Sequence, residues 1–161
     1  MLRDKNLVPL SRQHQHALAL CVRIDRATLA NQSNLDAWQS EIEQHFRAEI
    51  GIHFAAEEQV LFPAARQFAD LNPVVEQLLH DHAWLRARFA EAEARKMSAE
   101  ELRAFARRLS SHIRTEERTL FENLQELVGE VEMTRLGQRL DEALQGAEQA
   151  CILPTATRKE T

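Results

Sequence analysis

The stretch HFAAEEQVLF at residues 53–62 recurs at residues 112–121 as HIRTEERTLF, without a gap and at a constant offset of 59 residues. The histidine, both glutamates, the leucine and the phenylalanine are identical in the two copies, whereas the positions between them vary. A weaker likeness relates HQHA at residues 14–17 to HDHA at residues 80–83. Such an internal repeat predicts two tandem helical hairpins, each with a histidine on its first helix and the longer motif on its second.

The helix-breaking residues and helix-end signals in the remaining chain support this interpretation. Only four Gly and four Pro occur among 161 residues, and helix-forming residues predominate in most of the chain. We expect helices over 9–29, 35–63, 72–95, 99–128 and, shorter, 131–144. Ser33 with Asp36 and Ser98 with Glu101 predict N-terminal caps, and Pro73 should occupy the first position of the third helix. Pro63 should kink or end the second helix.

These elements predict an all-α fold, an antiparallel up-down-up-down four-helix bundle with a short extra C-terminal helix. The bundle domain should span residues 1–148, and residues 149–161 should form a disordered tail.

Composition argues against several classes of protein. The net charge of −5 does not favour nucleic-acid binding, and no apolar run is long enough for a membrane span. The N-terminus does not resemble a signal peptide, and Cys21 and Cys151 do not form a disulfide framework. We therefore expect a cytoplasmic protein with reduced thiols. The sequence does not predict the oligomeric state.

The spacing within the repeated motif indicates a metal site. Residues four apart share one helix face, so His53 with Glu57, and His112 with Glu116, can each approach one ion. Both pairs lie in apolar stripes, where buried carboxylates would be costly without compensation. Cations are the natural compensation.

The choice of the remaining histidines depends on the hydrophobic stripes. His82 falls on the apolar stripe of the third helix, which predicts that it faces the core. On the first helix the stripe favours His14, whereas alignment of the repeat favours His16. We choose His14 and keep His16 as the alternative.

Other polar residues near the motif have simpler interpretations. His45 is expected to be an ordinary satisfied side chain, and His80 to lie at the edge of the bundle or to hold a ligand in place. Glu58 and Glu117 lie about 100° round the helix from their neighbours, so they should be solvated or pair with arginine. An arginine-rich face should be solvated: Arg86, Arg88, Arg103, Arg107 and Arg108.

With these residues in view, the chain resembles the hemerythrin-like, HHE cation-binding domain family. The likeness covers about residues 7–128. It rests on Ser11-Arg12-Gln13-His14, on residues 53–63, on Asp81-His82 and on residues 112–121.

The resemblance implies an oxo- or hydroxo-bridged di-iron centre. Its implied ligands are His14, His53, His82 and His112 as terminal ligands and Glu57 and Glu116 as bridging carboxylates. Imidazole and carboxylate donors suit iron or manganese, and zinc is a possible substitute.

The likeness also has departures. Oxygen-carrying hemerythrins place two histidines one turn apart on the third helix, and Leu78 stands at the corresponding position here. Their fourth-helix carboxylate comes five residues after its histidine, whereas Glu116 comes four after His112. The four-histidine, two-glutamate set is more similar to di-iron proteins that repair iron centres, which carry adjacent cysteines that this sequence does not contain.

Two metal-dependent functions remain open from the sequence, beside the simpler possibility of a metal-free helical interaction module. The first is a protein that binds or senses a small ligand, O₂ or NO, or that holds iron. The alternative is a di-iron redox enzyme acting on peroxide or NO, or an iron donor for repair under nitrosative or oxidative stress. No separate acid, base or substrate-orienting motif is visible, which favours the first.

Overall fold

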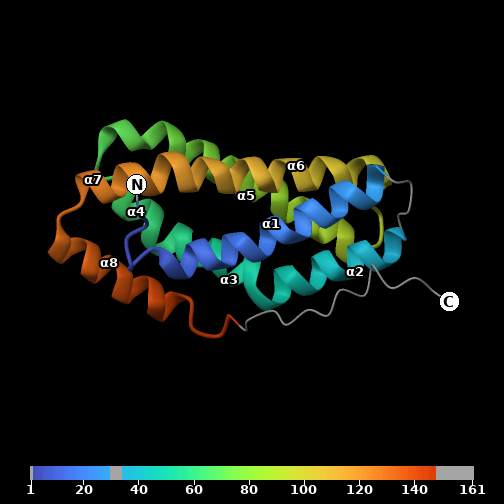
Figure 1. Ribbon diagram of the computed structural model, residues 1–161, viewed down its shortest axis with the longest axis horizontal. Coiled ribbons are helices and arrows are strands. Elements are labelled where there is room, and N and C mark those ends of the chain that lie inside the picture. Colours follow the sequence, from blue (N-terminus) through green and yellow to red (C-terminus); the bar gives the residue numbers. More distant parts are fainter. Residues whose placement is uncertain (1, 30–33, 148–161) are drawn as a thin grey trace.

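Four long helices and one shorter helix make up the part of the chain that the computed structural model describes, residues 2–29 and 34–147. No strand occurs within these residues. The long helices are α1 (Val8–Leu29), the continuous run 35–65, α5 (Asn72–Glu93) and the continuous run 99–127. They run back and forth along the long axis of the molecule (Figure 1), as expected for an up-down-up-down bundle. The predicted fold class is confirmed.

Wider π turns interrupt two of the long helices. The run 35–65 consists of α2 (Leu35–His45), η1 (Phe46–Ile50), α3 (Gly51–Ala56), η2 (Glu57–Leu61) and α4 (Phe62–Ala65). The run 99–127 consists of α6 (Ala99–Thr115), η4 (Glu116–Leu120) and α7 (Phe121–Leu127). The turns η2 and η4 begin 59 residues apart, so the sequence repeat is also a repeat of backbone geometry.

The helix ends match the predicted signals in part. Ser98 and Glu101 form the predicted capping box, and Pro73 lies in the first turn of α5. The cap of α2 was predicted wrongly, because Asn34 accepts from the Ala37 N–H and Ser33 lies outside the described residues.

The helix does not end at Pro63, which was one of the two predicted effects, but continues to Ala65. A proline ring clashes with the carbonyl four residues earlier in a regular helix. Here that carbonyl belongs to Gln59, which lies in the wider turn η2, and the turn relieves the conflict.

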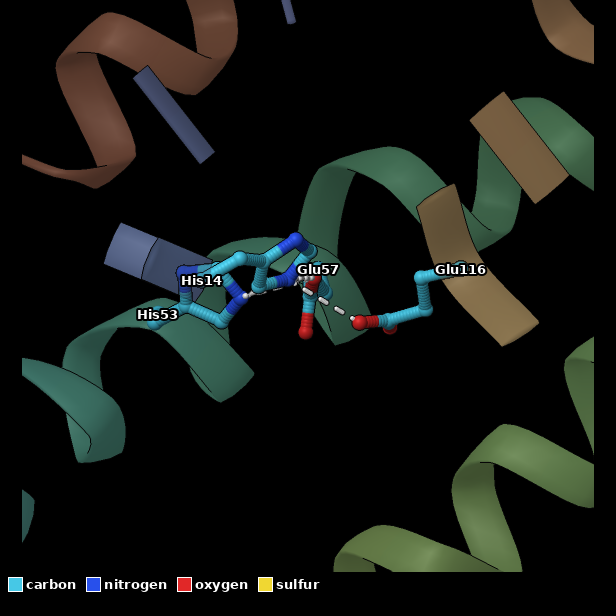
Figure 2. A group of neighbouring side chains, drawn as sticks. All are labelled: His14, His53, Glu57 and Glu116. Carbon is cyan, nitrogen blue, oxygen red and sulfur yellow. Dashed lines mark hydrogen bonds and ion pairs between the residues drawn. The ribbon is translucent and has the colours of Figure 1, made fainter. Parts of the chain in front are cut away.

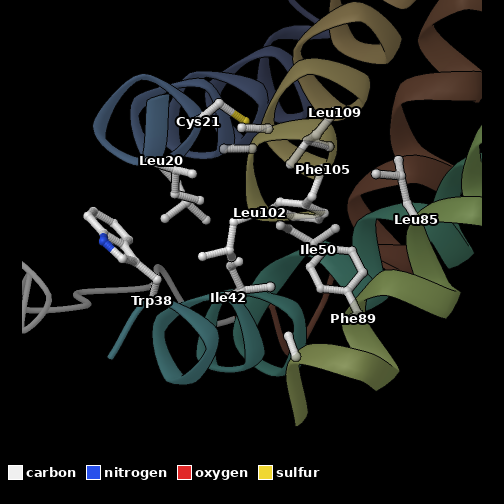
Figure 3. Packing of buried hydrophobic residues seen from close by; sticks show 14 of the residues in the cluster. Leu20, Cys21, Trp38, Ile42, Ile50, Leu85, Phe89, Leu102, Phe105 and Leu109 are labelled. Atoms are coloured by element: carbon white, nitrogen blue, oxygen red, sulfur yellow. The ribbon is translucent and has the colours of Figure 1, made fainter. Parts of the chain in front are cut away.

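The apolar core is divided into two clusters along the bundle axis. One lies around the α2 end of the bundle and includes Trp38, Ile42, Phe89, Leu102 and Phe105 (Figure 3). The other lies around the α4 and α7 end and includes Leu10, Leu61, Leu78, Leu120 and Leu124. Each fully buried side chain of this kind contributes roughly 1.5–3 kcal/mol of transfer free energy. The polar residues described below lie between the two clusters.

The fifth helix, α8 (Glu130–Ala143), packs beside α3 and η2. It buries Met133, Leu136 and Leu140 in the second cluster. At Gly137 the helix approaches the chain ahead of α1 so closely that an added Cβ would clash with the side chain of Asn6. The predicted extra C-terminal helix is therefore a docked part of the fold.

Candidate metal centre

All six residues predicted as metal ligands are brought together in one buried layer. Each of the four long helices contributes at least one of them. They are His14 on α1, His53 on α3, Glu57 at the start of η2, His82 on α5, His112 on α6 and Glu116 at the start of η4. None of these residues is more than 4% exposed.

The six residues form two overlapping groups that share both glutamates. In each group, one potential ligand atom from every member lies within 4.8 Å of the others. One group is His14, His53, Glu57 and Glu116 (Figure 2), and the other is Glu57, His82, His112 and Glu116. Two adjacent sites joined by shared carboxylates are the arrangement expected of a dinuclear metal centre.

The shortest contacts show how each carboxylate serves both groups. Oε1 of Glu57 lies 2.9 Å from Nε2 of His53, and its Oε2 lies 3.3 Å from Nε2 of His82. Oε2 of Glu116 lies 3.1 Å from Nε2 of His14 and 3.3 Å from Nε2 of His112. All four histidines therefore turn Nε2 toward the carboxylates.

The π turns place consecutive glutamates in different surroundings. Glu57 and Glu116, at the start of η2 and η4, are fully buried in the centre. Glu58 and Glu117, which follow them, are only partly buried and reach the outer side of the imidazoles. Wider turns of this type occur frequently at functional sites.

Glu58 and Glu117 hold two of the histidines from behind. Nδ1 of His82 donates to Glu58 at 2.7 Å, and Nδ1 of His14 donates to Glu117 at 2.7 Å. Arg86 also donates to Glu58, and Arg3 donates to Glu117, both at 2.6 Å. The arginine pairing was predicted, whereas the contact with the imidazoles was not.

The other two histidines are held by unlike partners. Nδ1 of His53 donates to Oε1 of Gln13 at 2.7 Å. Nδ1 of His112 lies 3.6 Å from Oδ2 of Asp81, whose Oδ1 accepts from Nε of Arg108 at 2.7 Å. The pair His82 and His112 thus has two carboxylates behind it, whereas the pair His14 and His53 has a carboxylate and an amide.

Arg86 and Arg108 therefore correct the prediction of a wholly solvated arginine face. Both support carboxylates that hold imidazoles of the centre. The sequence contained a signal for the four residues that lie behind the imidazoles. Gln13 and Asp81 directly precede His14 and His82, and the repeat retains Glu58 and Glu117. It contained no comparable signal for Arg3.

The donor set fits a pair of cations. Because Nδ1 donates to an oxygen in His14, His53 and His82, these imidazoles present the Nε2 lone pair to the centre, yet Nε2 of His14 and Nε2 of His53 are only 3.0 Å apart. Among the described residues, both oxygens of Glu57 and of Glu116 and Nε2 of His82 and His112 have no hydrogen-bond partner. Buried acceptors that converge in this way require positive charge between them.

The pKa values of the cluster also indicate that its buried carboxylates require positive charge nearby. Burial acts to lower the pKa of His14, but contacts with Glu116, Glu117 and Glu57 outweigh it and hold this pKa well above its usual value. Burial acts to raise the pKa of Glu57, but the charge on His53 and contacts with His14 and His82 hold it well below its usual value. Metal ions compete with protons for such groups.

The remaining histidines lie outside both groups. His16 is half-exposed and contacts Glu49, so the structure brings His14 and not His16 into the cluster. His80 is exposed, as expected at the edge of the bundle. His45 is buried, but its Nδ1 has no hydrogen-bond partner among the described residues, which differs from the satisfied side chain expected.

The cysteine within the described residues takes no part in the cluster. Cys21 is a free, buried cysteine, and burial raises its pKa to about 11, which disfavours the reactive thiolate. Cys151 lies outside the described residues.

Comparison with known protein families agrees with this geometry. The model of the hemerythrin HHE cation binding domain matches residues 8–124, which is most of the chain and includes all six clustered residues. The chain belongs to the hemerythrin HHE cation-binding family. Searches of curated proteins and of solved structures found no significant match.

As a member of the HHE family, the chain has buried His/Glu clusters suited to cations. The described helices of this HHE domain include none with the length and apolar character needed to cross a membrane.

Proposed function

We propose that this HHE domain holds two iron ions and uses them to bind or sense a small diatomic ligand, O₂ or NO. One ion would be held by His14 and His53 and the other by His82 and His112. Glu57 and Glu116 would bridge the two.

Iron is favoured by the chemistry of the donors. Neutral imidazoles and carboxylates suit iron or manganese, whereas structural zinc sites commonly use thiolates, which the cluster does not contain. An iron pair, when bound, supplies a redox-active centre able to take up O₂ or NO.

The observation that carries the choice of ligand is a small cavity on one side of the cluster. His14, His53 and His112 line it, and five apolar residues close it on the side of the first core cluster: Ala17, Ile50, Phe54, Leu109 and Ile113. It has room for about one water-sized molecule, about 10 Å³. A space of this size suits a diatomic molecule and excludes larger substrates.

The protein's own residues would orient and protect the centre. Glu58, Glu117, Gln13 and Asp81 fix the imidazole rings from behind, and the rings of Phe54 and His82 stack at a centroid distance of 3.8 Å. The apolar residues round the cavity keep bulk water away from the ligand.

Optical spectroscopy tests the proposal. Protein reconstituted with Fe(II) under anaerobic conditions should change its visible absorption when O₂ or NO is added in stoichiometric amounts. An unchanged spectrum after both additions, with iron bound, would contradict the proposal.

A further inference from the structure

A polar stripe runs along the second long helix from its outer end to the cluster. Its members are four residues apart and all are buried: Glu41, His45, Glu49, His53 and Glu57. The last two belong to the cluster, whereas Glu49 lies one helical turn before it. Glu49 is 2% exposed, and its one ion-pair partner among the described residues is His16, at 3.1 Å.

Glu49 also lies where two hollows meet. It lines the small cavity beside His14 and His53, and it lines a surface groove of about 310 Å³ together with His16. Gln13 is the other residue common to both linings. A path from this groove to the cavity therefore passes these two side chains.

We propose that Glu49 and His16 form the entry point through which a divalent metal ion passes from this groove to the buried cluster. The inference rests on the proposed metal centre and assigns a loading role to residues that the centre does not use. A carboxylate and an imidazole are donors of the same kind as those in the cluster.

The chemistry of the path favours a cation as its occupant. A neutral diatomic molecule gains nothing from a carboxylate, and the apolar lining of the cavity already suits it. A hydrated cation instead needs ligands that replace its water stepwise, and Glu49 stands one turn from His53 and two from Glu57. The groove is also lined by the exposed Arg12, which repels cations, so Glu49, as the one carboxylate among the described residues of the lining, is the group that attracts them.

Loading kinetics of the full chain, stripped of metal and then mixed with Co²⁺, test this role. Glu49→Gln should slow cobalt uptake about tenfold, because a carboxylate at the mouth of a path raises the local cation concentration. Chelator-driven release should slow by a similar factor, with two ions still bound at equilibrium. The difference from the unmodified protein should shrink at high ionic strength.

Two further variants make the result specific. His16→Ala alters a half-exposed side chain, so folding should be preserved, and it should slow uptake to a smaller extent. Glu43→Gln removes the same charge from the same helix, but Glu43 pairs with Arg47 and Arg95 and lines neither hollow, so its uptake rate should be unchanged.

Each contrary result has a distinct meaning. Uptake by Glu49→Gln and His16→Ala at the unmodified rate would overturn the entry role while leaving the metal centre intact. Loss of bound cobalt at equilibrium in Glu49→Gln would also overturn it, by making Glu49 part of the centre. Failure of the unmodified protein to bind cobalt would overturn the proposed centre itself.

Discussion

Nδ1 of His14 donates to the carboxylate of Glu117 at 2.7 Å. The same contact, at the same distance, joins His82 to Glu58. In both cases the glutamate and the histidine belong to different hairpins, so each hairpin orients an imidazole of the other. This exchange gives a physical reason for the second glutamate in both copies of the motif.

Glu58→Gln and Glu117→Gln should each weaken metal binding by roughly 10–100-fold, because loss of the carboxylate behind an imidazole lowers its basicity and frees its orientation. Glu57→Ala should lower metal content further, since it removes a carboxylate that contacts both groups. Chelator competition at fixed pH measures these affinities.

Glu126→Gln is the matched control for Glu117→Gln, because Glu126 is an exposed carboxylate on α7. It should bind metal as the unmodified protein does. Equal losses in Glu57→Ala and Glu58→Ala would mean that the roles of the two consecutive glutamates have been assigned wrongly.

The two ions should bind with unequal affinity. Carboxylates stand behind both His82 and His112, whereas His53 has only the amide of Gln13 behind it. The site formed by His82 and His112 should therefore fill first. Asp81→Asn should reduce the difference in affinity between the first and second metal ions. Stepwise titration monitored by calorimetry measures this difference. Identical titrations of Asp81→Asn and the unmodified protein would refute the assignment of the tighter site to His82 and His112.

Much of the fold could be predicted because its signals are local. The repeat, the capping box at Ser98 and the proline at position 73 all lie in short stretches of sequence. The π turns were not predictable in this way, because they shift the backbone hydrogen bonds without requiring special residue types. The continuation of the helix past Pro63 has the same origin.

In the candidate site, too, the features with local sequence signals could be predicted and the others could not. The i, i+4 spacing of His53 with Glu57, and of His112 with Glu116, predicted pairs that the structure brings together. The contacts of Arg3 and Glu49 depend on segments that meet only after the helices pack. Hydrophobic periodicity favoured His14, which the structure brings into the cluster, whereas alignment of the repeat favoured His16.

The stability of the protein should depend on pH through His45. Burial, followed by the charges of Arg23 and His16, lowers the pKa of His45 from 6.5 to about 4. Between these values the unfolded chain binds a proton that the folded chain excludes, so stability falls as pH falls from about 6.5 to about 4. Folding should lose roughly 2 kcal/mol at pH 4.5 through this group.

Urea unfolding at pH 7 and pH 4.5, in one metal state, checks this dependence. His45→Gln should lose less stability between the two pH values than the unmodified protein does. His80→Gln is the control, because its side chain is exposed, and it should keep the full dependence. Parallel behaviour of His45→Gln and the unmodified protein would contradict the prediction.

Filling the cavity should weaken ligand binding without removing metal. Ala17→Val adds two methyl groups to a side chain that lines the cavity, and we expect about tenfold weaker NO binding, since one methylene can have this effect in a tight apolar pocket. Ala19→Val makes the same change at an exposed position of α1 and should have no effect. NO titration of the Fe(II) protein measures both. Unaltered NO affinity in Ala17→Val would place the ligand elsewhere.

The iron content of the folded chain tests the central claim most directly. The protein is reconstituted anaerobically with excess Fe(II), freed of unbound metal and analysed by inductively coupled plasma mass spectrometry. It should contain two iron ions per chain. Glu57→Ala and Glu116→Ala should each fall well below that value. Iron close to zero in the unmodified protein, or full iron content in both variants, would contradict a dinuclear centre built on the shared glutamates.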